Sequence, residues 1–370
     1  MTTMTSLDRP DADVSQDASS RARLDRIPDD MAMLRAAAEL TRDLNPPKQW
    51  FYWTDLLVSA AIGYGAIAVA ILSSNPWIVI PALAAAVLAI YRAGLFIHEL
   101  THVRHASLPW FRLGWNLIVG VPQLVPSFMY EGVHSLHHAR TRYGTAEDPE
   151  YLSLALMKPW TLPVFVLISA LGPIAVLFRF GVLTPLSAVF PSVRNVVIAR
   201  YSSLSINPAF RRRPPEGELA RQWRWQAAGA SIWAITLVGL TIAGIIPLRA
   251  FVIFVGVASA VMVINQVRTL VAHLWENDGE VLSTTAQYLD SVNVPPPGVL
   301  PLLWAPVGLR YHALHHLLPG LPYHSLAEAH RRLSAALAPD SPYHRANYPT
   351  LSGLVVRLTA NSMRQGRKVG

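Results

Sequence analysis

The chain has 370 residues, of which 52% are hydrophobic and only 15% are charged, and its formal net charge is +8. Soluble globular proteins are about one quarter charged, so this composition favours a membrane protein. The absence of cysteine excludes disulfides, thiolate-bound zinc and cysteine-ligated iron–sulfur clusters. In a membrane protein an excess of arginine marks cytoplasmic loops, so we expect no nucleic-acid partner.

The N-terminal part of the chain is polar and precedes the first apolar run. Residues 1–30 are rich in Ser, Asp, Thr and Arg, which predicts a disordered tail. Residues 31–44 have the periodicity of a helix that lies on the membrane surface. We therefore divide the chain into a tail with an interfacial helix (1–48), a membrane domain (49–338) and a basic C-terminal tail (339–370).

Four apolar runs are long enough to cross a bilayer core of about 30 Å. They cover approximately residues 56–74, 77–97, 226–246 and 250–267. Only short turns join the first two and the last two, which predicts two helical hairpins. The apolar stretch 111–128 contains several Gly and Pro residues, so we interpret it as re-entrant or interfacial.

Histidines gather in three clusters outside the predicted spans. His98 and His102 stand four residues apart at the end of the second span, and His105 extends the same helical stripe. Two further clusters share the pattern H-x-x-H-H, namely His134, His137 and His138, and His312, His315 and His316. Ten of the 13 histidines lie in these clusters or at His273, which follows the fourth span. This concentration predicts a metal centre.

The ligand type alone does not choose the metal, because neutral imidazole suits Fe, Zn, Cu and Ni. The setting is more informative, since a site at the mouth of lipid-embedded helices faces lipid substrates. Breaking an unactivated C–H bond of a lipid needs a redox metal and O₂, with the protein supplying binding and orientation. Nine histidines suffice to hold two metal ions.

A shared site restricts the topology of the apolar run 162–185. If this run crossed the membrane completely, the first and third histidine clusters would lie on opposite sides. We therefore predict that it dips into the membrane as a hairpin or covers the bundle as an amphipathic segment. The positive-inside rule then places both termini and all three clusters in the cytoplasm.

The three clusters resemble the histidine boxes of integral-membrane fatty acid desaturases and their hydroxylase relatives. That family has H-x(3,4)-H, two H-x-x-H-H boxes and one further histidine after the last span. The resemblance implies an all-α integral membrane fold, with four spanning helices and a cytosolic helical cap that carries a di-iron site. The implied ligands are His98, His102, His134, His137, His138, His273, His312, His315 and His316.

The expected reaction is the O₂-dependent desaturation of a long acyl chain in a lipid or thioester. The boxes leave open a hydroxylase or ketolase that acts on an alkane, a sphingolipid or a carotenoid. A distant alternative is a zinc membrane protease, because His98-Glu99-Leu-Thr-His102 matches H-E-x-x-H.

Further residues and partners complete the expected site. His105 is a possible additional ligand, and four acids are candidates to hold ligand imidazoles through the nitrogen that does not bind metal, namely Glu99, Asp148, Glu150 and Glu276. The sequence contains no haem, flavin or iron–sulfur motif. We therefore expect an external electron donor, a ferredoxin or a cytochrome b5-like protein with its reductase, to dock on the arginine-rich face.

Overall fold

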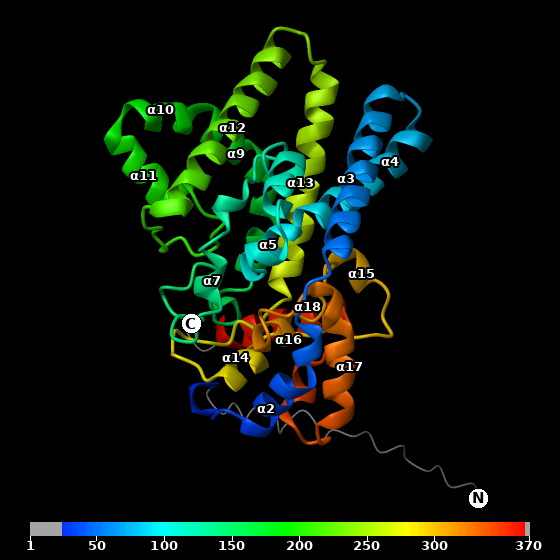
Figure 1. The fold of residues 1–370 in the computed structure, drawn as a ribbon, viewed down its shortest axis with the longest axis vertical. Coiled ribbons are helices and arrows are strands. Elements are labelled where there is room, and N and C mark those ends of the chain that lie inside the picture. The colour runs from blue at the N-terminus through cyan, green and yellow to red at the C-terminus, as the bar shows by residue number, and fades with distance from the viewer. Residues whose placement is uncertain (1–23, 367–370) are drawn as a thin grey trace, which may run out of the picture.

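The computed structural model describes residues 24–366, in which, apart from three isolated β-bridges, all regular structure is helical (Figure 1). The helices are α2 (Met31–Leu40), α3 (Gln49–Leu72), α4 (Pro76–Gly94), α5 (Phe96–His102), α6 (Phe111–Trp115), α7 (His134–His137), α8 (Thr161–Leu167), α9 (Gly172–Phe178), α10 (Thr184–Val189), α11 (Pro191–Tyr201), α12 (Gly217–Ile242), α13 (Leu248–Leu270), α14 (Thr284–Asp290), α15 (Pro301–Trp304), α16 (His312–Leu317), α17 (Leu326–Ala336) and α18 (Leu351–Gly366).

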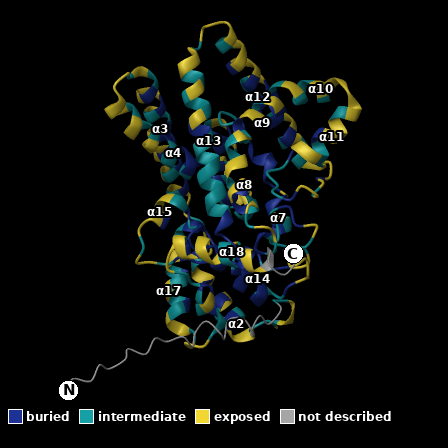
Figure 2. Cartoon of the chain, turned by 180° about the vertical axis from the view of Figure 1, so that it is seen from behind, coloured by how far each residue is buried: buried dark blue, intermediate teal, exposed yellow. Residues whose placement is uncertain are grey.

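Two helical hairpins, α3–α4 and α12–α13, project from one end of the molecule (Figure 1). The turn between α3 and α4 is sharp because Asn75 accepts a hydrogen bond from the backbone of Trp77, and Pro76 occupies the first helical position. Large apolar side chains at the two hairpin tips are exposed, including Leu72 at 84% and Ile242 at 82%. Figure 2 shows exposed residues along the outer faces of both hairpins. Such faces are suited to lipid rather than water.

Within residues 24–366, five helical runs are long and apolar enough to cross a membrane, whereas we predicted four spans. They are Gln49–Leu72, Pro76–His102, Thr161–Val189, Gly217–Ile242 and Leu248–Leu270. The additional run, Thr161–Val189, contains a 3₁₀ turn at Ile168–Leu171 and a π turn at Arg179–Leu183. These turns join α8, α9 and α10 into one apolar run of 29 residues, longer than the segment considered from the sequence.

The chain on either side of this additional run meets at one place. The backbone N–H of Ile206 donates to the carbonyl of Pro149 (3.0 Å), and the amide of Asn207 donates to the carbonyl of Asp148 (2.9 Å). Residues 150–205, which contain α8 to α11, therefore begin and end beside the same loop.

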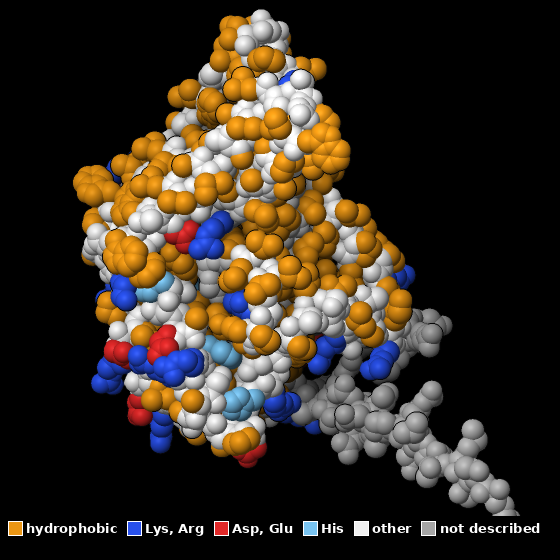
Figure 3. Space-filling model, turned by 90° about the vertical axis from the view of Figure 1, so that its right-hand side faces the viewer, with side chains coloured by type: hydrophobic (Ala, Val, Ile, Leu, Met, Phe, Trp, Pro, Cys, Tyr) orange, Lys and Arg blue, Asp and Glu red, His pale blue; other side chains and the backbone are white. Residues whose placement is uncertain are grey.

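A second region, which we call the cap, consists of α2, α14, α16, α17 and α18 and lies opposite the hairpin tips (Figure 1). Met33 and Ala37 of α2 are buried in one cluster with Ala329 and Leu333 of α17, so the apolar stripe of α2 is covered by protein. The segment expected as a C-terminal tail contains α18. In Figure 3 hydrophobic side chains dominate the hairpin end, whereas charged side chains gather over the cap. The predicted disorder of residues 1–30 concerns mostly residues 1–23, which lie outside the described range.

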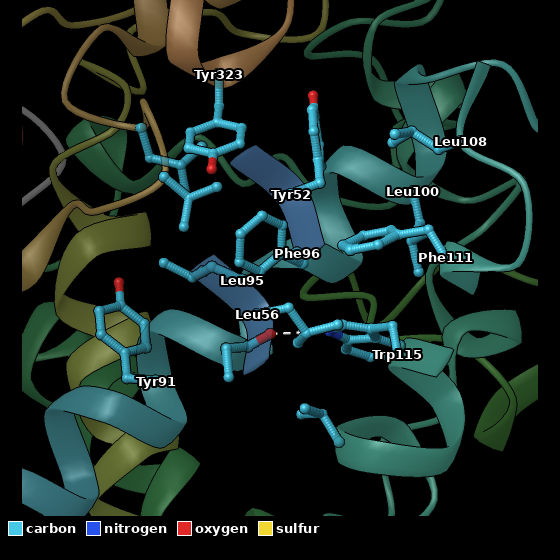
Figure 4. Close-up of a cluster of buried hydrophobic side chains, with 14 of the residues drawn as sticks. Tyr52, Leu56, Tyr91, Leu95, Phe96, Leu100, Leu108, Phe111, Trp115 and Tyr323 are labelled. Atoms are coloured by element: carbon cyan, nitrogen blue, oxygen red, sulfur yellow. Dashed lines mark hydrogen bonds between the residues drawn. The ribbon is translucent and has the colours of Figure 1, made fainter. Parts of the chain in front are cut away.

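An aromatic cluster joins the first hairpin to the cap below the first histidine box (Figure 4). Tyr52 of α3 makes edge contacts with Phe111 (5.5 Å between ring centroids) and with Tyr323 (5.0 Å), which precedes α17. Phe96 of α5 packs into the same cluster, and Trp115 donates a hydrogen bond to the carbonyl of Ala93 (2.8 Å). The cluster therefore fixes the helix that carries the first box.

The stretch predicted to be re-entrant, 111–128, is irregular, and buried side chains from within it and from α12 pair with its backbone. It contains α6, a π turn at Asn116–Gly120 and a 3₁₀ turn at Ser127–Met129. The side chain of Asn116 donates to the hydroxyl of Ser127 and accepts from its backbone N–H, both at 2.9 Å. The Gln226 amide of α12 accepts from the backbone of Phe128 (2.9 Å). An irregular backbone at membrane depth requires this kind of pairing.

Candidate metal centre

The first histidine box lies on the short helix α5, whose two faces have different roles. Phe96 and Leu100, four residues apart, are buried in the aromatic cluster. His98 and His102 have the same spacing, two residues further along, and therefore project from a different face. His98 is 4% exposed and His102 is half-buried. Apolar packing of one face thus orients the two imidazoles.

The second box lies on the single turn α7, and the loop before it is held by a buried arginine. The guanidinium of Arg212 donates to the backbone carbonyls of Phe128 and Glu131, both at 2.6 Å, and stacks on the ring of Trp223 at 4.4 Å. The N–H of His134 then donates to the carbonyl of Tyr130 (3.1 Å). A helix this short gains its stability from such tertiary contacts.

His273 and the third box are brought together by the segment 291–294. His273 forms an isolated β-bridge with Ser291, and Asn293 forms one with Tyr311, the residue before the third box. The side chain of Asn293 also accepts from the N–H of Leu314 (3.0 Å), one of the free donors at the start of α16. His273 and the third box are far apart in sequence, but both lie against the extended segment 291–294.

The nine predicted ligands fall into two groups, which we call the five-histidine group and the four-histidine group. The five-histidine group is His98, His102, His134, His138 and His315, and the four-histidine group is His137, His273, His312 and His316. Within each group one nitrogen from every ring lies within 4.8 Å of the others. The groups are adjacent, because the rings of His138 and His316 stack at 4.3 Å between centroids. Nine histidines therefore form two neighbouring metal-sized clusters.

The nitrogens that face one another are suited to a cation. The Nε2 atoms of His134 and His138 are 3.0 Å apart, and those of His273 and His312 are also 3.0 Å apart. Where the Nδ1 atom donates its hydrogen to another group, Nε2 carries a lone pair, so two such atoms repel unless a cation lies between them. The Nε2 atoms of His98 and His102 are buried without a hydrogen-bond partner. Both observations fit metal binding at each group.

Two of the predicted acids hold histidines of the second box. Asp148 is fully buried, accepts from the Nδ1 of His137 (2.9 Å) and is fixed by the backbone N–H groups of Gly144 and Glu150, both at 2.8 Å. Gly144 has φ +69°, and a side chain there would collide with the amide of Asn277. The carboxylate therefore sits on a turn that only glycine permits.

Glu150 holds the neighbouring histidine in the other group. Its carboxylate lies 2.8 Å from the Nδ1 of His134 and accepts from the hydroxyl of Tyr130 at 2.7 Å. Burial raises the pKa of Glu150 to about 7. The tyrosine also lies 2.9 Å from the same Nδ1. Carboxylate and phenol together fix the ring of His134 with its Nε2 directed into the five-histidine group.

Burial controls the protonation of the histidines outside the spanning segments. It lowers the pKa of His134, His138, His273, His312, His315 and His316 well below the usual histidine value, with further lowering from neighbouring histidines. His137 differs, because burial lowers its pKa but the carboxylates of Asp148 and Glu150 outweigh this effect and raise it. Neutral imidazole is the form that binds metals, so most of the site is in its binding form at neutral pH.

Glu99 faces away from the nitrogens that the first box directs into the five-histidine group. Its carboxylate accepts from the hydroxyl of Tyr52 (2.6 Å) and from the backbone of Tyr323 (3.2 Å), and its closest approach to the His98 ring is 3.8 Å. It therefore ties α5 to α3 and to the cap. A zinc protease needs this glutamate beside the metal as a general base, which its hydrogen bonds do not favour.

Two other candidate residues lie apart from both groups. His105 lies on a 3₁₀ turn after α5, is exposed and belongs to neither group. Glu276 accepts from the amide of Asn361 in α18 (2.9 Å) and lies 3.8 Å from Arg357. Its position links the cap to the loop after α13.

The structure also assigns contacts that the sequence analysis did not identify. The hydroxyl of Tyr143 lies 2.9 Å from the Nδ1 of His273 and donates to the buried carboxylate of Asp290 (2.8 Å). The hydroxyl of Ser291 lies 3.2 Å from the same Nδ1. Burial raises the pKa of Asp290 to about 7. Tyr143 stands next to the acidic turn before Asp148, which is a usable signal, whereas no local pattern marks Asp290.

Comparisons with known proteins agree with this geometry. The sequence model of the fatty acid desaturase family matches residues 74–348, which include all three boxes and His273. A curated relative, ceramide hydroxylase from Caulobacter vibrioides (strain NA1000 / CB15N), is 46% identical over 322 residues. The aligned region covers 87% of this chain and 92% of the relative.

Proposed function

Because the chain belongs to the fatty acid desaturase family, we propose that it is a membrane oxidoreductase that uses O₂ and two iron ions to hydroxylate the acyl part of a ceramide-type lipid. The observation that carries the metal chemistry is the division of nine histidines into two adjacent groups of five and four. A structural zinc ion needs only four ligands, so one inert ion would leave most of these histidines unexplained.

The proposed ligands are the nine histidines of the two groups, each binding through the nitrogen that faces its group. Asp148, Glu150 and Tyr143 hold three of the rings through the opposite nitrogen and so fix their tautomer and orientation. When bound, iron would supply the redox chemistry with O₂ that no side chain possesses. The residues of the chain orient the ligands and keep the imidazoles neutral.

Hydroxylation of a ceramide-type lipid is favoured by the extent of the similarity to the relative. A 46% identity over almost the full length of both chains includes the helices as well as the boxes. Desaturation of an acyl chain is the second candidate, favoured by the family match itself. Both reactions consume O₂, two electrons and two protons. Hydroxylation yields the alcohol and one water, whereas desaturation yields the alkene and two waters.

A large apolar cavity among the membrane helices offers room for a lipid tail. It measures about 460 Å³ and is lined by Tyr64, Ile118, Val121, Pro122, Trp233 and Phe254. Apart from the indole of Trp233, these side chains carry one polar group, the hydroxyl of Tyr64. It donates a hydrogen bond to the carbonyl of Ile118 (2.7 Å). Ile118 and Val121 belong to the stretch that leads into the second box. These features support a lipid acyl chain as the substrate.

We also propose four spans, with both termini and the metal centre in the cytoplasm. Boxes one and two precede the run Thr161–Val189, and box three follows it, yet their histidines share two groups. Complete crossing by all five runs would separate them. The hydrogen bonds of Ile206 and Asn207 to the loop at Pro149 support a run that returns to the side it left.

The topology can be tested by single-cysteine labelling, because the natural chain contains no cysteine. We expect Ser74→Cys, in the turn between α3 and α4, to react with an impermeant maleimide on the non-cytoplasmic side of intact cells. Ser352→Cys in α18 should react only after the membrane is opened. Labelling of both from the same side contradicts the proposed orientation.

Electrons would come from a ferredoxin or a cytochrome b5-like protein with its reductase. An acidic donor would be attracted to the exposed arginines of this surface, such as Arg140 (64% exposed) and Arg331 (70% exposed). Reversal of one of these charges is expected to raise the KM for the donor and to lower the salt dependence of this KM, while single-turnover oxidation by reduced enzyme stays unchanged.

The central experiment measures metal and product in the same preparation. We expect about two irons per chain in the purified protein and, in cells supplied with ceramide, a product that has gained one oxygen atom. A product that has lost two hydrogens identifies the desaturase. One zinc per chain with no lipid change contradicts the proposal.

A further inference from the structure

A small, partly open cavity lies beside His312 of the four-histidine group. It measures about 10 Å³ and is lined by side chains from the end of α13, the segment 292–294 and the start of the third box, including Arg268, Ala272, Arg310 and His312. A buried water needs about 10–15 Å³ measured in this way, together with polar partners. The cavity therefore has the size of one water molecule.

Two of the residues that line this cavity each carry a buried nitrogen with no hydrogen-bond partner among the described residues. They are the Nε of Arg268 and the Nδ1 of His312. The rest of the Arg268 guanidinium is held, since its Nη2 donates to the side chains of Asn265 (3.2 Å) and Thr269 (3.0 Å) on its own helix. The arginine is therefore held through Nη2, while its Nε hydrogen has no partner among the described residues.

Both nitrogens are donors, so they cannot satisfy each other. The guanidinium is always protonated and its Nε always carries a hydrogen. The Nε2 of His312 faces the Nε2 atoms of His273 (3.0 Å) and His316 (3.2 Å), so the hydrogen of the neutral ring is on Nδ1. Two donors on one small cavity require an acceptor between them, because an unsatisfied buried donor is destabilising.

We propose that this cavity binds one ordered water that accepts hydrogen bonds from Arg268 Nε and His312 Nδ1. Arg268 is then a positioning residue, which fixes His312 through the water in the same way that Asp148 fixes His137 directly. Arg310 has a different task, because its guanidinium donates to the carbonyls of Val294 (2.8 Å) and Gly298 (3.0 Å).

This inference rests on the proposed function, in which His312 binds iron. It follows that His312, the first histidine of the third box, is held indirectly by Arg268, which carries a fixed positive charge. Removal of that partner should free the ring to rotate and weaken metal binding at the four-histidine group. Outer partners of ligand histidines typically contribute about 10–100-fold to metal affinity or activity.

The test uses the full-length protein and Fe(II) alone, without lipid. Arg268→Met keeps an unbranched side chain but removes the donor and the charge, and we expect at least about tenfold weaker Fe(II) binding in competition with a chelator. Arg268→Lys keeps a charged donor and should restore most of the affinity. Arg221→Gln, at an arginine on α12 that is 71% exposed, is the charge-matched control and should bind like the wild type.

A second variant is designed to displace the proposed water without changing Arg268. Ala272→Val fills the cavity and should weaken Fe(II) binding in the same direction, with a changed Mössbauer spectrum of the iron-loaded protein. A high-resolution structure of the wild type should show density for an oxygen atom between the two nitrogens. The two variants therefore decide the question even if one of them fails to fold.

The outcomes separate the inference from the proposed function. If the wild type binds two irons and Arg268→Met binds them equally tightly, the water site is wrong and the proposed function stands. If Arg268→Met changes only the KM for lipid, the arginine contacts substrate and the inference is also wrong. If the wild type binds no Fe(II), the proposed function fails, and the inference fails with it.

Discussion

The two histidine groups differ in exposure and in support. All members of the four-histidine group are buried, whereas His102 and His138 of the five-histidine group are half-buried. In the four-histidine group His137 and His273 are held by Asp148 and by the pair Tyr143–Ser291. In the five-histidine group only His134 has a carboxylate within hydrogen-bond distance. The four-histidine group is therefore the better preorganised of the two.

Because of this difference, the two groups are expected to behave differently during turnover. A buried group in which two of the four rings are also held at Nδ1 changes little during turnover. A more accessible group with fewer held ligands can tolerate small ligand movements and is the side that small molecules reach. We infer that the four-histidine group retains its metal more strongly than the five-histidine group does.

The largest effect is expected from the loss of a metal ligand. His315→Ala removes one nitrogen from the five-histidine group, and we expect product formation to fall by more than about 100-fold, since outer partners alone are worth about 10–100-fold. Iron content should fall from about two towards one per chain, because the four-histidine group is untouched. Metal analysis and lipid profiling check this, and retained activity contradicts the assignment of the third box.

The next largest effect is expected at the carboxylates that hold one histidine of each group. Asp148→Asn should weaken metal binding about 10–100-fold, because the amide cannot replace the charge that faces His137. Glu150→Gln should cost less than about tenfold, because the hydroxyl of Tyr130 still lies 2.9 Å from the Nδ1 of His134. Chelator competition on both variants measures the difference. Equal losses show that the two groups are supported alike.

The metal-free protein should lose stability as the pH falls below about 6.5. Six buried histidines have a lowered pKa, so the unfolded chain takes up protons at about pH 6.5 while the folded chain does not. Stability then falls with decreasing pH, by about 1.4 kcal/mol per pH unit for each net proton. His137 acts in the opposite direction, because its raised pKa makes the folded chain bind its proton more strongly.

The raised pKa values of Glu150 and Asp290 also act in the opposite direction, between about pH 7 and their unfolded values, but they are outnumbered. Thermal unfolding of the metal-free protein at pH 7.5 and pH 5.5, values chosen about one unit either side of 6.5, measures the net effect. Asp148→Asn removes the contribution of His137, so its stability should fall more steeply. A pH-independent Tm is inconsistent with neutral buried histidines.

The smallest effect is expected at a histidine outside both groups. His324 accepts from the backbone of Lys48 (3.1 Å) and stacks near Phe51 at 5.0 Å. His324→Ala should leave turnover within about twofold of the wild type, as most substitutions away from a site do. Product assays on this variant beside His315→Ala test the boundary of the site. An inactive His324→Ala enzyme requires a larger site.

Several features could be predicted from the sequence because they are periodic. Long uncharged runs specify membrane helices, and the two hairpins lie near the expected residues. The histidines were found because a spacing of three or four residues puts side chains on one helical face. The fifth long apolar run was not counted as a span, because a complete crossing would place the first and third histidine clusters on opposite sides of the membrane. The helix continues there through 3₁₀ and π turns.

Other features of the site have no local signal. Asp290 reaches His273 through Tyr143, over a sequence separation of 147 residues between the acid and the tyrosine. Glu99 was a candidate to hold an imidazole, but its hydrogen bonds go to Tyr52 and Tyr323, which belong to distant segments. Such pairings depend on how helices pack, and no spacing rule encodes them.

The sequence by itself determined which residue types could bind metal and that they face one end of membrane helices. Only the tertiary structure decided how the nine histidines divide. His137 and His138 are neighbours in sequence but belong to different groups, and so do His315 and His316. Successive helical residues point about 100° apart, so each H-x-x-H-H box faces both groups at once. The division therefore arises where helices from distant parts of the chain meet.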